Sequence, residues 1–258
     1  MQRKLVRLVI FLGMVALLAP LSAQEQTVAF SDLGGPKRLE MKLFNGAIHV
    51  SAGDVEGVVI KATDAGGAAV KSTDENPTKY PGMRRYRARG DFEVSESENT
   101  VRIKTLPPFQ NRSFDITVPR KIDLSLSVIN GPGIEIEGVE GKIDVRVING
   151  KLKIINVAGA VVAHCLNQTL EATFTSVDPH SAMSFTSLNG NVDVTFPRDI
   201  SADVVLKTLR GEIVSDFELT LDAKERLGGE VRGRINNGGP LMRLETFNGD
   251  VILRRREP

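Results

Sequence analysis

Outward-facing carboxylates are the side chains of this chain that could perform acid–base chemistry. Pairs of Asp or Glu side chains that converge within several ångströms hydrolyse glycosidic bonds. The outward acidic candidates are Glu135, Glu171, Asp193 and Asp203. They are interspersed with the basic residues Arg146, Lys153 and Lys207, and a surface of mixed charge is ordinary for a soluble protein. Since Trp is also absent and only 2 Tyr occur, we predict no catalytic residues and no enzymatic activity.

The histidines and the single cysteine predict no metal or redox site. His49, His164 and His180 fall in separate stretches without ligand spacing. We therefore assign no metal ligand, no cofactor-binding residue and no cofactor. Alternation along a strand predicts that His164 points outward and Cys165 inward. Cys165 has the position that Val147 has in its own segment, so we expect it to be a small buried hydrophobic residue.

The N-terminus has the pattern of a secretory signal peptide. Basic residues precede an apolar stretch from Leu8 to Leu21, and small residues end at Ala23. The apolar stretch is short for a membrane crossing, which needs about 20 residues. We predict cleavage after Ala23; an uncleaved anchor is the alternative. The protein is then exported to the periplasm, the cell surface or the medium, without a transmembrane segment in the mature chain.

Net charge argues against nucleic acid as a partner. The whole chain has a formal charge of +1. Removal of residues 1–23 takes away three basic residues and no acidic ones, which leaves a charge of about −2. One cysteine allows no disulfide within a monomer. Stability must come from the burial of apolar side chains.

One apolar pattern recurs around Asn-Gly pairs. The segments LEMKLFNGAIHV, IDVRVINGKLKI, MSFTSLNGNVDV and MRLETFNGDVIL superpose without a gap. Weaker copies surround Asn167 and Arg210, and a copy at Asn130 has one extra residue. Alternation with period two predicts β-strands with one buried and one solvent-facing side. Because Asn and Gly tolerate positive φ, we expect each pair to form a sharp turn.

The spacing of these turns favours a solenoid over a meander of hairpins. Turn positions 130, 149, 167, 189 and 210 are 18 to 22 residues apart, close to the shortest known solenoid repeats. We predict an all-β, parallel β-helix or β-solenoid with coils of about 18–22 residues. Each Asn would hold a corner by bonding to the backbone of neighbouring turns. Gly150→Val should destabilise the protein, because positive φ is costly for a β-branched residue.

Stacked coils would place equivalent residues above one another in two buried rows. The row four residues before each turn is Met41, Leu126, Val145, Ala163, Phe185, Leu206 and Leu244. The row directly before each turn is Phe44, Ile129, Ile148, Leu166, Leu188, Leu209 and Phe247. We expect both rows to face the core.

A polar stretch interrupts the pattern at about residues 65–90. It is rich in turn-forming and charged residues, and it contains Tyr80 and Tyr86 beside four arginines. It is either a mobile loop or an exposed functional one. We predict a signal peptide at 1–23 and one solenoid domain at 24–258 that carries this excursion.

The ordered series of Asn-Gly strands resembles a known family. The run FDITVPRKIDLSLSVINGPGIEIEGVEGKIDVRVINGKLKI, then TSLNGNVDVTFPRDISADVVLKTLRGEI and the closing LETFNGDVILRR are similar to the bacterial putative-adhesin family of unknown function. The resemblance covers about residues 27 to 255. It implies a right-handed β-helix-like fold in exported, auto-transporter-adhesin-like proteins. The family supplies no catalytic residues.

The sequence thus predicts a non-enzymatic exported β-solenoid. Its expected role is adhesin-like binding, or service as an envelope scaffold, through its lateral surface. The expected partner is an unidentified envelope or extracellular macromolecule. The alternative is a polysaccharide-active β-helix enzyme, a lyase or a hydrolase, because fold alone does not decide function.

Overall fold

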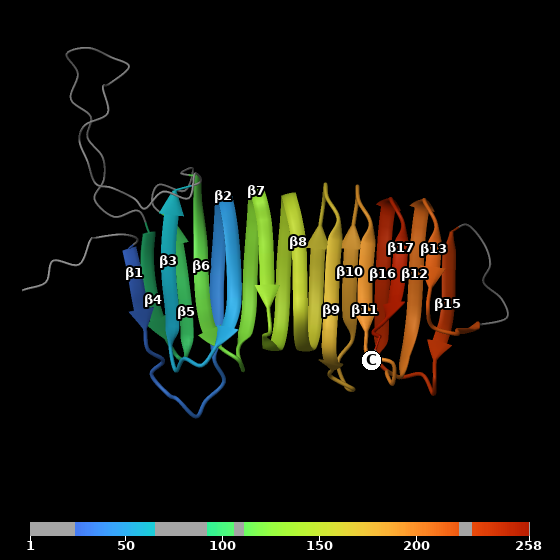
Figure 1. The fold of residues 1–258 in the computed structure, drawn as a ribbon, viewed down its shortest axis with the longest axis horizontal. Coiled ribbons are helices and arrows are strands. Elements are labelled where there is room, and N and C mark those ends of the chain that lie inside the picture. The colour runs from blue at the N-terminus through green and yellow to red at the C-terminus, as the bar shows by residue number, and fades with distance from the viewer. Residues whose placement is uncertain (1–23, 65–91, 106–110, 222–228, 258) are drawn as a thin grey trace, which may run out of the picture.

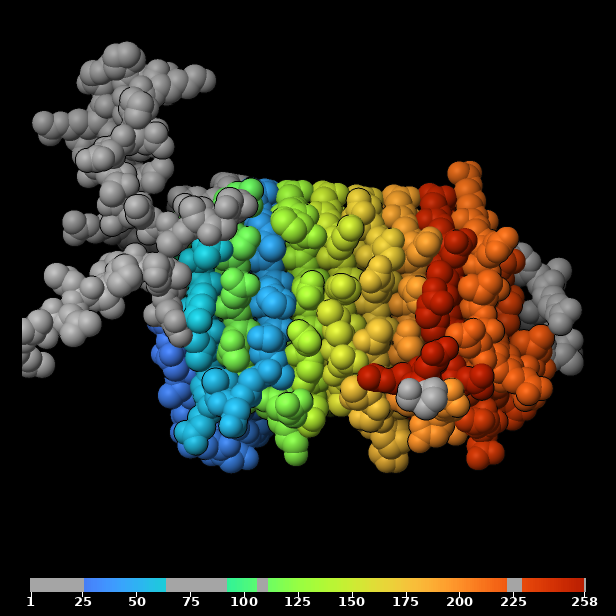
Figure 2. Space-filling model, in the orientation of Figure 1, coloured from blue at the N-terminus to red at the C-terminus, as the bar shows by residue number. Residues whose placement is uncertain are grey.

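The computed structural model describes residues 24–64, 92–105, 111–221 and 229–257. The predicted signal peptide at 1–23 and the excursion at 65–90 lie outside these residues. The described part is elongated, and its strands stand side by side across the long axis (Figure 1). The space-filling view has the same elongated outline (Figure 2). Among the described residues no helix is long and apolar enough to cross a membrane.

Every regular element of the described residues is a β-strand, as predicted. The strands before the middle of the molecule are β1 (Gln24–Val28), β2 (Arg38–Gly53), β3 (Val58–Asp64), β4 (Phe92–Ser97), β5 (Thr100–Thr105) and β6 (Asn111–Pro119). The middle strands are β7 (Asp123–Glu137), β8 (Glu140–Cys165), β9 (Leu170–Val177), β10 (Met183–Ser187) and β11 (Val192–Phe196). The last are β12 (Ala202–Arg210), β13 (Ile213–Ser215), β14 (Thr220–Leu221), β15 (Glu230–Ile235), β16 (Leu241–Asn248) and β17 (Val251–Arg255).

These strands form one open sheet of mixed orientation, which differs from the uniformly parallel sheet that the spacing predicts. Pairs in the middle are parallel, including β2 with β7, β7 with β8, and β8 with β9. Antiparallel pairs stand at both ends: β3 with β1 and β6, β4 with β5, and β15 with β12 and β14. Hairpins at the ends replace bare parallel edges, which would invite pairing with other chains.

Each Asn-Gly pair lies at a corner between two walls. We call the stretch before the pair the first wall and the stretch after it the second wall; one corner with its two walls is a level. In β2, β7 and β8 the strand continues through the pair without a break. The predicted sharp turn is therefore a bend within a continuous strand.

The first and last levels are inserted one place inward from the ends. β2 lies between β5–β6 on one side and β7 on the other. Likewise β16–β17 lie between β10–β11 and β12–β13. Figure 1 shows the blue β2 beside green strands and the red β16 and β17 to the left of the orange β12. The stacking therefore does not follow chain order at this end, because Asn248 stands between Asn189 and Arg210.

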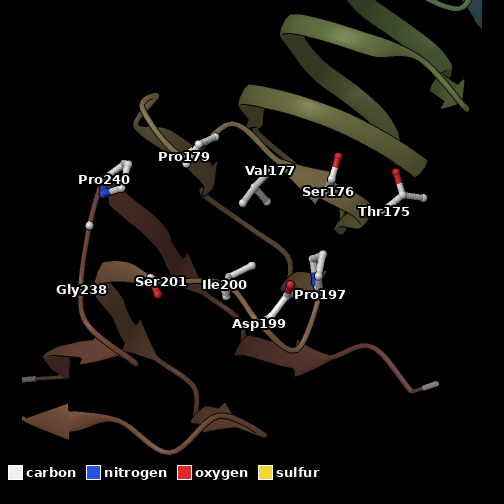
Figure 3. Close-up of a pocket in the computed structure, with 11 residues that line it drawn as sticks. Thr175, Ser176, Val177, Pro179, Pro197, Asp199, Ile200, Ser201, Gly238 and Pro240 are labelled. Atoms are coloured by element: carbon white, nitrogen blue, oxygen red, sulfur yellow. The ribbon is translucent and has the colours of Figure 1, made fainter.

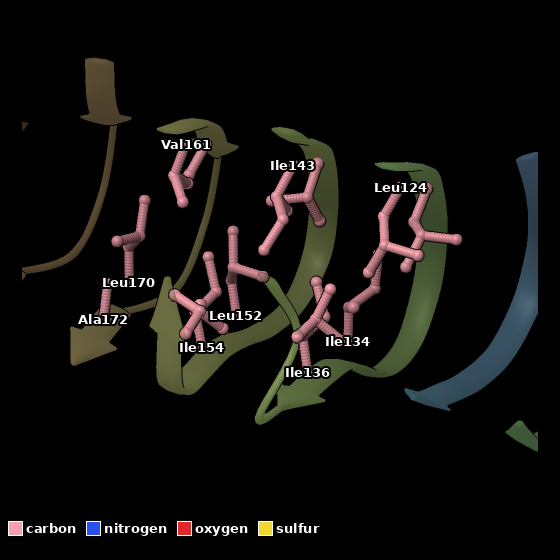
Figure 4. Close-up of a cluster of buried hydrophobic side chains, with 14 of the residues drawn as sticks. Leu124, Ile134, Ile136, Ile143, Leu152, Ile154, Val161, Leu170 and Ala172 are labelled. Carbon is pink, nitrogen blue, oxygen red and sulfur yellow. The ribbon is translucent and has the colours of Figure 1, made fainter. Parts of the chain in front are cut away.

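The core is built from rows of like residues, as the alternation predicts. Figure 4 shows three of these rows, all at most 3% exposed: Leu124, Ile143 and Val161 from the first wall, and Ile134, Leu152 and Leu170, and Ile136, Ile154 and Ala172, from the second. The row predicted four residues before each corner is likewise buried and in register. Its spatial order is Met41, Leu126, Val145, Ala163, Phe185, Leu244 and Leu206.

Three phenyl rings fill the middle of the core. Phe174 stacks on Phe196 with centroids 4.9 Å apart, and Phe185 meets both edge-on at 5.9 and 6.1 Å. Ala163 lies beside Phe185 in its row, so a small residue leaves room for a large one. Each ring is completely buried. This cluster packs between the two walls at the levels of Asn167 and Asn189.

Candidate binding surface

The corner carries a continuous ladder of side-chain amides. Five amides donate from Nδ2 to the Oδ1 of the asparagine one level away, at 2.7 to 3.2 Å. The members in spatial order are Asn45, Asn130, Asn149, Asn167, Asn189 and Asn248. The predicted bonds to neighbouring backbone are therefore replaced by bonds between amides. Asn167, whose Asn-Gln sequence departs from the pattern, takes its full place in the ladder.

The glycines of the corner are required by close stacking. A Cβ on Gly150 would lie 2.7 Å from the carbonyl oxygen of Gly131, in the next level. Gly150 does not have the positive φ that the sequence predicts. Gly249 combines both constraints, with φ of 146° and a Cβ position 2.5 Å from the Gly190 oxygen. Levels approach this closely because their backbones hydrogen-bond to each other through the corner, as Asn248 N does to Leu188 O at 2.8 Å.

The row directly before the corner is on the outside of the molecule, so its predicted burial is wrong. We call it the apolar row: Phe44, Ile129, Ile148, Leu166, Leu188, Phe247 and Leu209 in spatial order. Its first three members are half-buried. Leu166, Leu188, Phe247 and Leu209 are 40%, 41%, 42% and 61% exposed.

The bend explains why alternation fails at this row. Residues two before the corner and the corner glycine point inward, as Val147 and Gly150 do. The two residues between them, such as Ile148 and Asn149, both face outward on the convex side. A strict period of two would have placed one of the two inside.

Hydroxyl and thiol groups support the corner from within. Thr208 Oγ1 donates to Gly249 O at 2.7 Å, and Thr246 Oγ1 donates to Gly190 O at 2.8 Å. Cys165 occupies the equivalent inward position and is buried, as predicted. Its thiol lies 3.5 Å from Gly150 O, and burial raises its pKa. These contacts fasten one level to the next beneath the exposed strip.

The second wall brings most of the predicted acidic candidates into one row. Glu135 lies beside Lys153, Lys153 beside Glu171, and Glu171 beside Asp193. Asp193 accepts three hydrogen bonds from Arg254, at 2.8, 3.0 and 3.1 Å, and this pairing raises the pKa of Arg254. Basic side chains thus interrupt the row at Lys153 and pair with it at Asp193.

Asp203 and the histidines lie apart from one another. Asp203 belongs to β12, beside Leu241. His49 contacts Glu135 on the second wall, with 3.9 Å between Nε2 and Oε1. His164 faces outward on the first wall, as predicted, where burial and the charge of Arg146 lower its pKa. His180 is exposed in a loop. Within the described ranges no cluster of three or more His, Cys, Asp or Glu could hold a metal ion.

A shallow hollow of about 430 Å³ opens at the ends of the walls far from the corner (Figure 3). It is lined by Thr175, Ser176, Val177, Pro179, Pro197, Asp199, Ile200, Ser201, Gly238, Gly239 and Pro240. Asp199 is the one ionisable side chain in this lining. A single carboxylate lacks the partner that acid–base cleavage of a glycosidic bond requires.

Comparisons with known proteins match no family model, and the solved structures that resemble the chain include two distant ones from bacteria. No family model and no curated protein matches the chain. A crystal structure described as a putative cell adhesion protein from Clostridium sporogenes has 10% identity and a TM-score of 0.46, covering 91% of this chain and 100% of that one. A structure described as a putative adhesin from Bacteroides fragilis has 9% identity and a TM-score of 0.37, covering 92% and 98%. At these scores neither likeness transfers a function.

The exposed part of the apolar row is the feature that sequence reasoning missed. The sequence alignment identifies these residues as an equivalent row, but period-two alternation places them in the core. The signal that could have exposed them is the pair of non-alternating residues, such as Leu188-Asn189, directly before a glycine. We call the apolar row together with the amide ladder the corner strip.

Proposed function

We propose that this chain is a non-enzymatic, exported binding protein, adhesin-like or an envelope scaffold, that contacts other macromolecules through its lateral surface. The observation that supports this role is the corner strip. Leu166, Leu188, Phe247 and Leu209 stand on adjacent levels, each 40% exposed or more. A contiguous apolar patch of a few hundred Å² on the surface of a protein is often a functional contact surface.

The proposal includes a finer description of the fold, a right-handed parallel solenoid of 18- to 22-residue coils between its hairpin ends. In-register parallel pairing of β2, β7 and β8 supports it. Stacked levels of this kind make a stiff surface in which equivalent side chains recur about every 4.8 Å. Such a surface can bind an extended partner without first paying the entropy of ordering itself.

The chemistry of the other surfaces agrees with binding. The acidic row of the second wall alternates with Lys153 and is tied to Arg254. The hollow in Figure 3 presents Asp199 without a second ionisable group in its lining. Both arrangements suit solvated surfaces, whereas catalysis on a polysaccharide needs two groups that act together.

Retention of envelope material by the immobilised full-length chain tests the proposal. We expect Leu188→Asp to reduce retention of source-bacterium envelope fragments at least fivefold, because a carboxylate placed in an apolar contact loses hydration without gaining a partner. Leu241→Asp is the matched control, since Leu241 is 39% exposed on the first wall away from the corner. Release of reducing ends from envelope polysaccharide, abolished by Asp199→Asn, would show an enzyme instead.

A further inference from the structure

The C-terminal half of the corner strip has the chemistry of a carbohydrate platform. Leu166, Leu188, Phe247 and Leu209 form an uninterrupted apolar line over four adjacent levels. Sugar rings present faces of C–H groups that pack on such side chains, and the exposed phenyl ring of Phe247 suits them best. The line runs across the strands, because successive levels are stacked in register.

The amide ladder runs alongside this apolar line. Asn167, Asn189 and Asn248 each donate one N–H within the ladder, at 2.7, 3.0 and 2.8 Å. A primary amide has two N–H donors and an oxygen with two acceptor sites. Each of these three amides therefore uses one of its two N–H donors within the ladder and keeps one further N–H. The level of Leu209 has Arg210 in place of asparagine. Sugar hydroxyls both donate and accept, so they match these amides.

Charge along this part of the strip points to an uncharged ligand. The corner residues Asn167-Gln168 and Asn189-Gly190 are neutral, and so is Asn248. Arg210 stands at the end of the strip, where its guanidinium lies 6.0 Å from the centroid of the Phe247 ring. An anionic polymer is usually held by several basic side chains in a row, and such a row is absent from the strip's described residues.

The exposed area is too small for a second copy of the chain. The four exposed side chains present on the order of 350 Å² of apolar surface, which is within the range of the largest apolar patch on a typical monomer. A stable protein interface buries about 800 Å² on each partner. A narrow line of this area suits a linear chain of sugar residues lying along it. The level-to-level repeat is close to the length of one residue in an extended β-linked glycan, so successive rings would meet successive levels.

We propose that the corner strip, over the levels of Leu166, Leu188, Phe247 and Leu209, binds an uncharged β-linked polysaccharide that lies parallel to the long axis of the molecule. This inference rests on the proposed binding function and names its ligand class. Ring faces pack on the apolar row, and hydroxyls bond to the amide ladder. The stiffness of the stacked levels presents the platform ready-formed, which limits the entropy lost on binding.

Affinity electrophoresis of the full chain through gels that contain hydroxyethyl cellulose tests the ligand class, with chitohexaose titration as a second probe. We expect retardation by the neutral polymer and weaker retardation by polygalacturonate at equal concentration. The double variant Leu188→Ser/Phe247→Ser should bind at least tenfold more weakly. Its matched control is Val162→Ser/Leu241→Ser, which removes side chains 38% and 39% exposed on the first wall and should bind within twofold of the parent chain. Circular dichroism shows whether each variant is folded.

The outcomes separate this inference from the proposed function. Absence of binding to both neutral glycans, or equal binding by the strip variant and its control, overturns the glycan assignment. If the strip variant still loses envelope retention, the binding function stands and its ligand is of another class. If retention is also unchanged, the strip is no binding surface and the proposed function falls too. A dimer that becomes a monomer only in the strip variant would identify a second copy as the occupant.

Discussion

The amide ladder makes an energetic prediction that a double-mutant cycle can test. Asn149→Ala removes two hydrogen bonds, to Asn130 at 2.8 Å and from Asn167 at 2.7 Å. Asn167→Ala also removes two, one of them shared with Asn149 and the other from Asn189 at 3.0 Å. The double variant therefore loses three bonds, whereas the two single variants together lose four.

The expected magnitudes follow from this count. A net hydrogen bond contributes about 0.5–1.5 kcal/mol to stability. Asn149 is exposed, so water replaces part of each lost bond and the lower end applies. We expect each single variant to lose about 1 kcal/mol of unfolding free energy. The coupling energy between the two positions should be about 0.5 kcal/mol or more.

Urea unfolding followed by circular dichroism measures these free energies, since the chain contains no tryptophan. The control cycle pairs Asn149→Ala with Asn248→Ala. These residues share no bond in the ladder and stand three levels apart, roughly 14 Å at the usual strand spacing. Their effects should add within about 0.3–0.5 kcal/mol. Equal coupling in both cycles would refute the ladder as a set of specific pairwise bonds.

Three further predictions concern the corner and the core. Gly150→Val should lower the unfolding free energy by more than about 3 kcal/mol, because neighbouring backbones must move apart to admit the side chain. In the control Gly34→Val the added Cβ meets no atom closer than 3.5 Å, so the loss should be below about 1 kcal/mol. Denaturant midpoints measure both losses. Phe185→Ala should lose about 3–5 kcal/mol by leaving a cavity, measured by the same unfolding, and a loss below 1 would contradict the central cluster. Burial raises the pKa of the Cys165 thiol above its ordinary value of about 8.5. The buried neutral thiol therefore contributes fully to the unfolding free energy below the ordinary pKa, and this stability is lost as pH rises through the folded pKa. Cys165→Ser should flatten that alkaline loss, and an unchanged pH profile of stability would contradict it.

The sequence was sufficient to predict the strands and the buried rows. Period-two alternation identified Leu126, Val145 and Phe185 as equivalent, and all three are buried in register. This succeeded because each level must bury one face against the same faces of its neighbours. The inward position of Cys165 followed from the same periodicity.

Other features depended on interactions that alternation does not encode. The outward position of Leu188 and Phe247 follows from a bend that places two successive residues on the convex side. The amide ladder requires knowledge of which asparagines are one level apart, and Asn248 meets Asn189 only because the last level is inserted inward. The order of levels is set by end hairpins such as β12 with β15, a long-range choice without a local sequence signature.

The inward insertion of the last level constrains how the protein can be made and how it can lengthen. A further level cannot stack directly on β16–β17, because these strands are enclosed by β10–β11 on one side and β12–β13 on the other. During synthesis β12 and β13 emerge before their parallel neighbours β16 and β17, so this end of the sheet is completed only once those later strands have been made. The carboxyl-terminal segment thus serves as the closing piece of the fold, and a chain truncated before Leu241 would lack the level that joins its last strands to the rest.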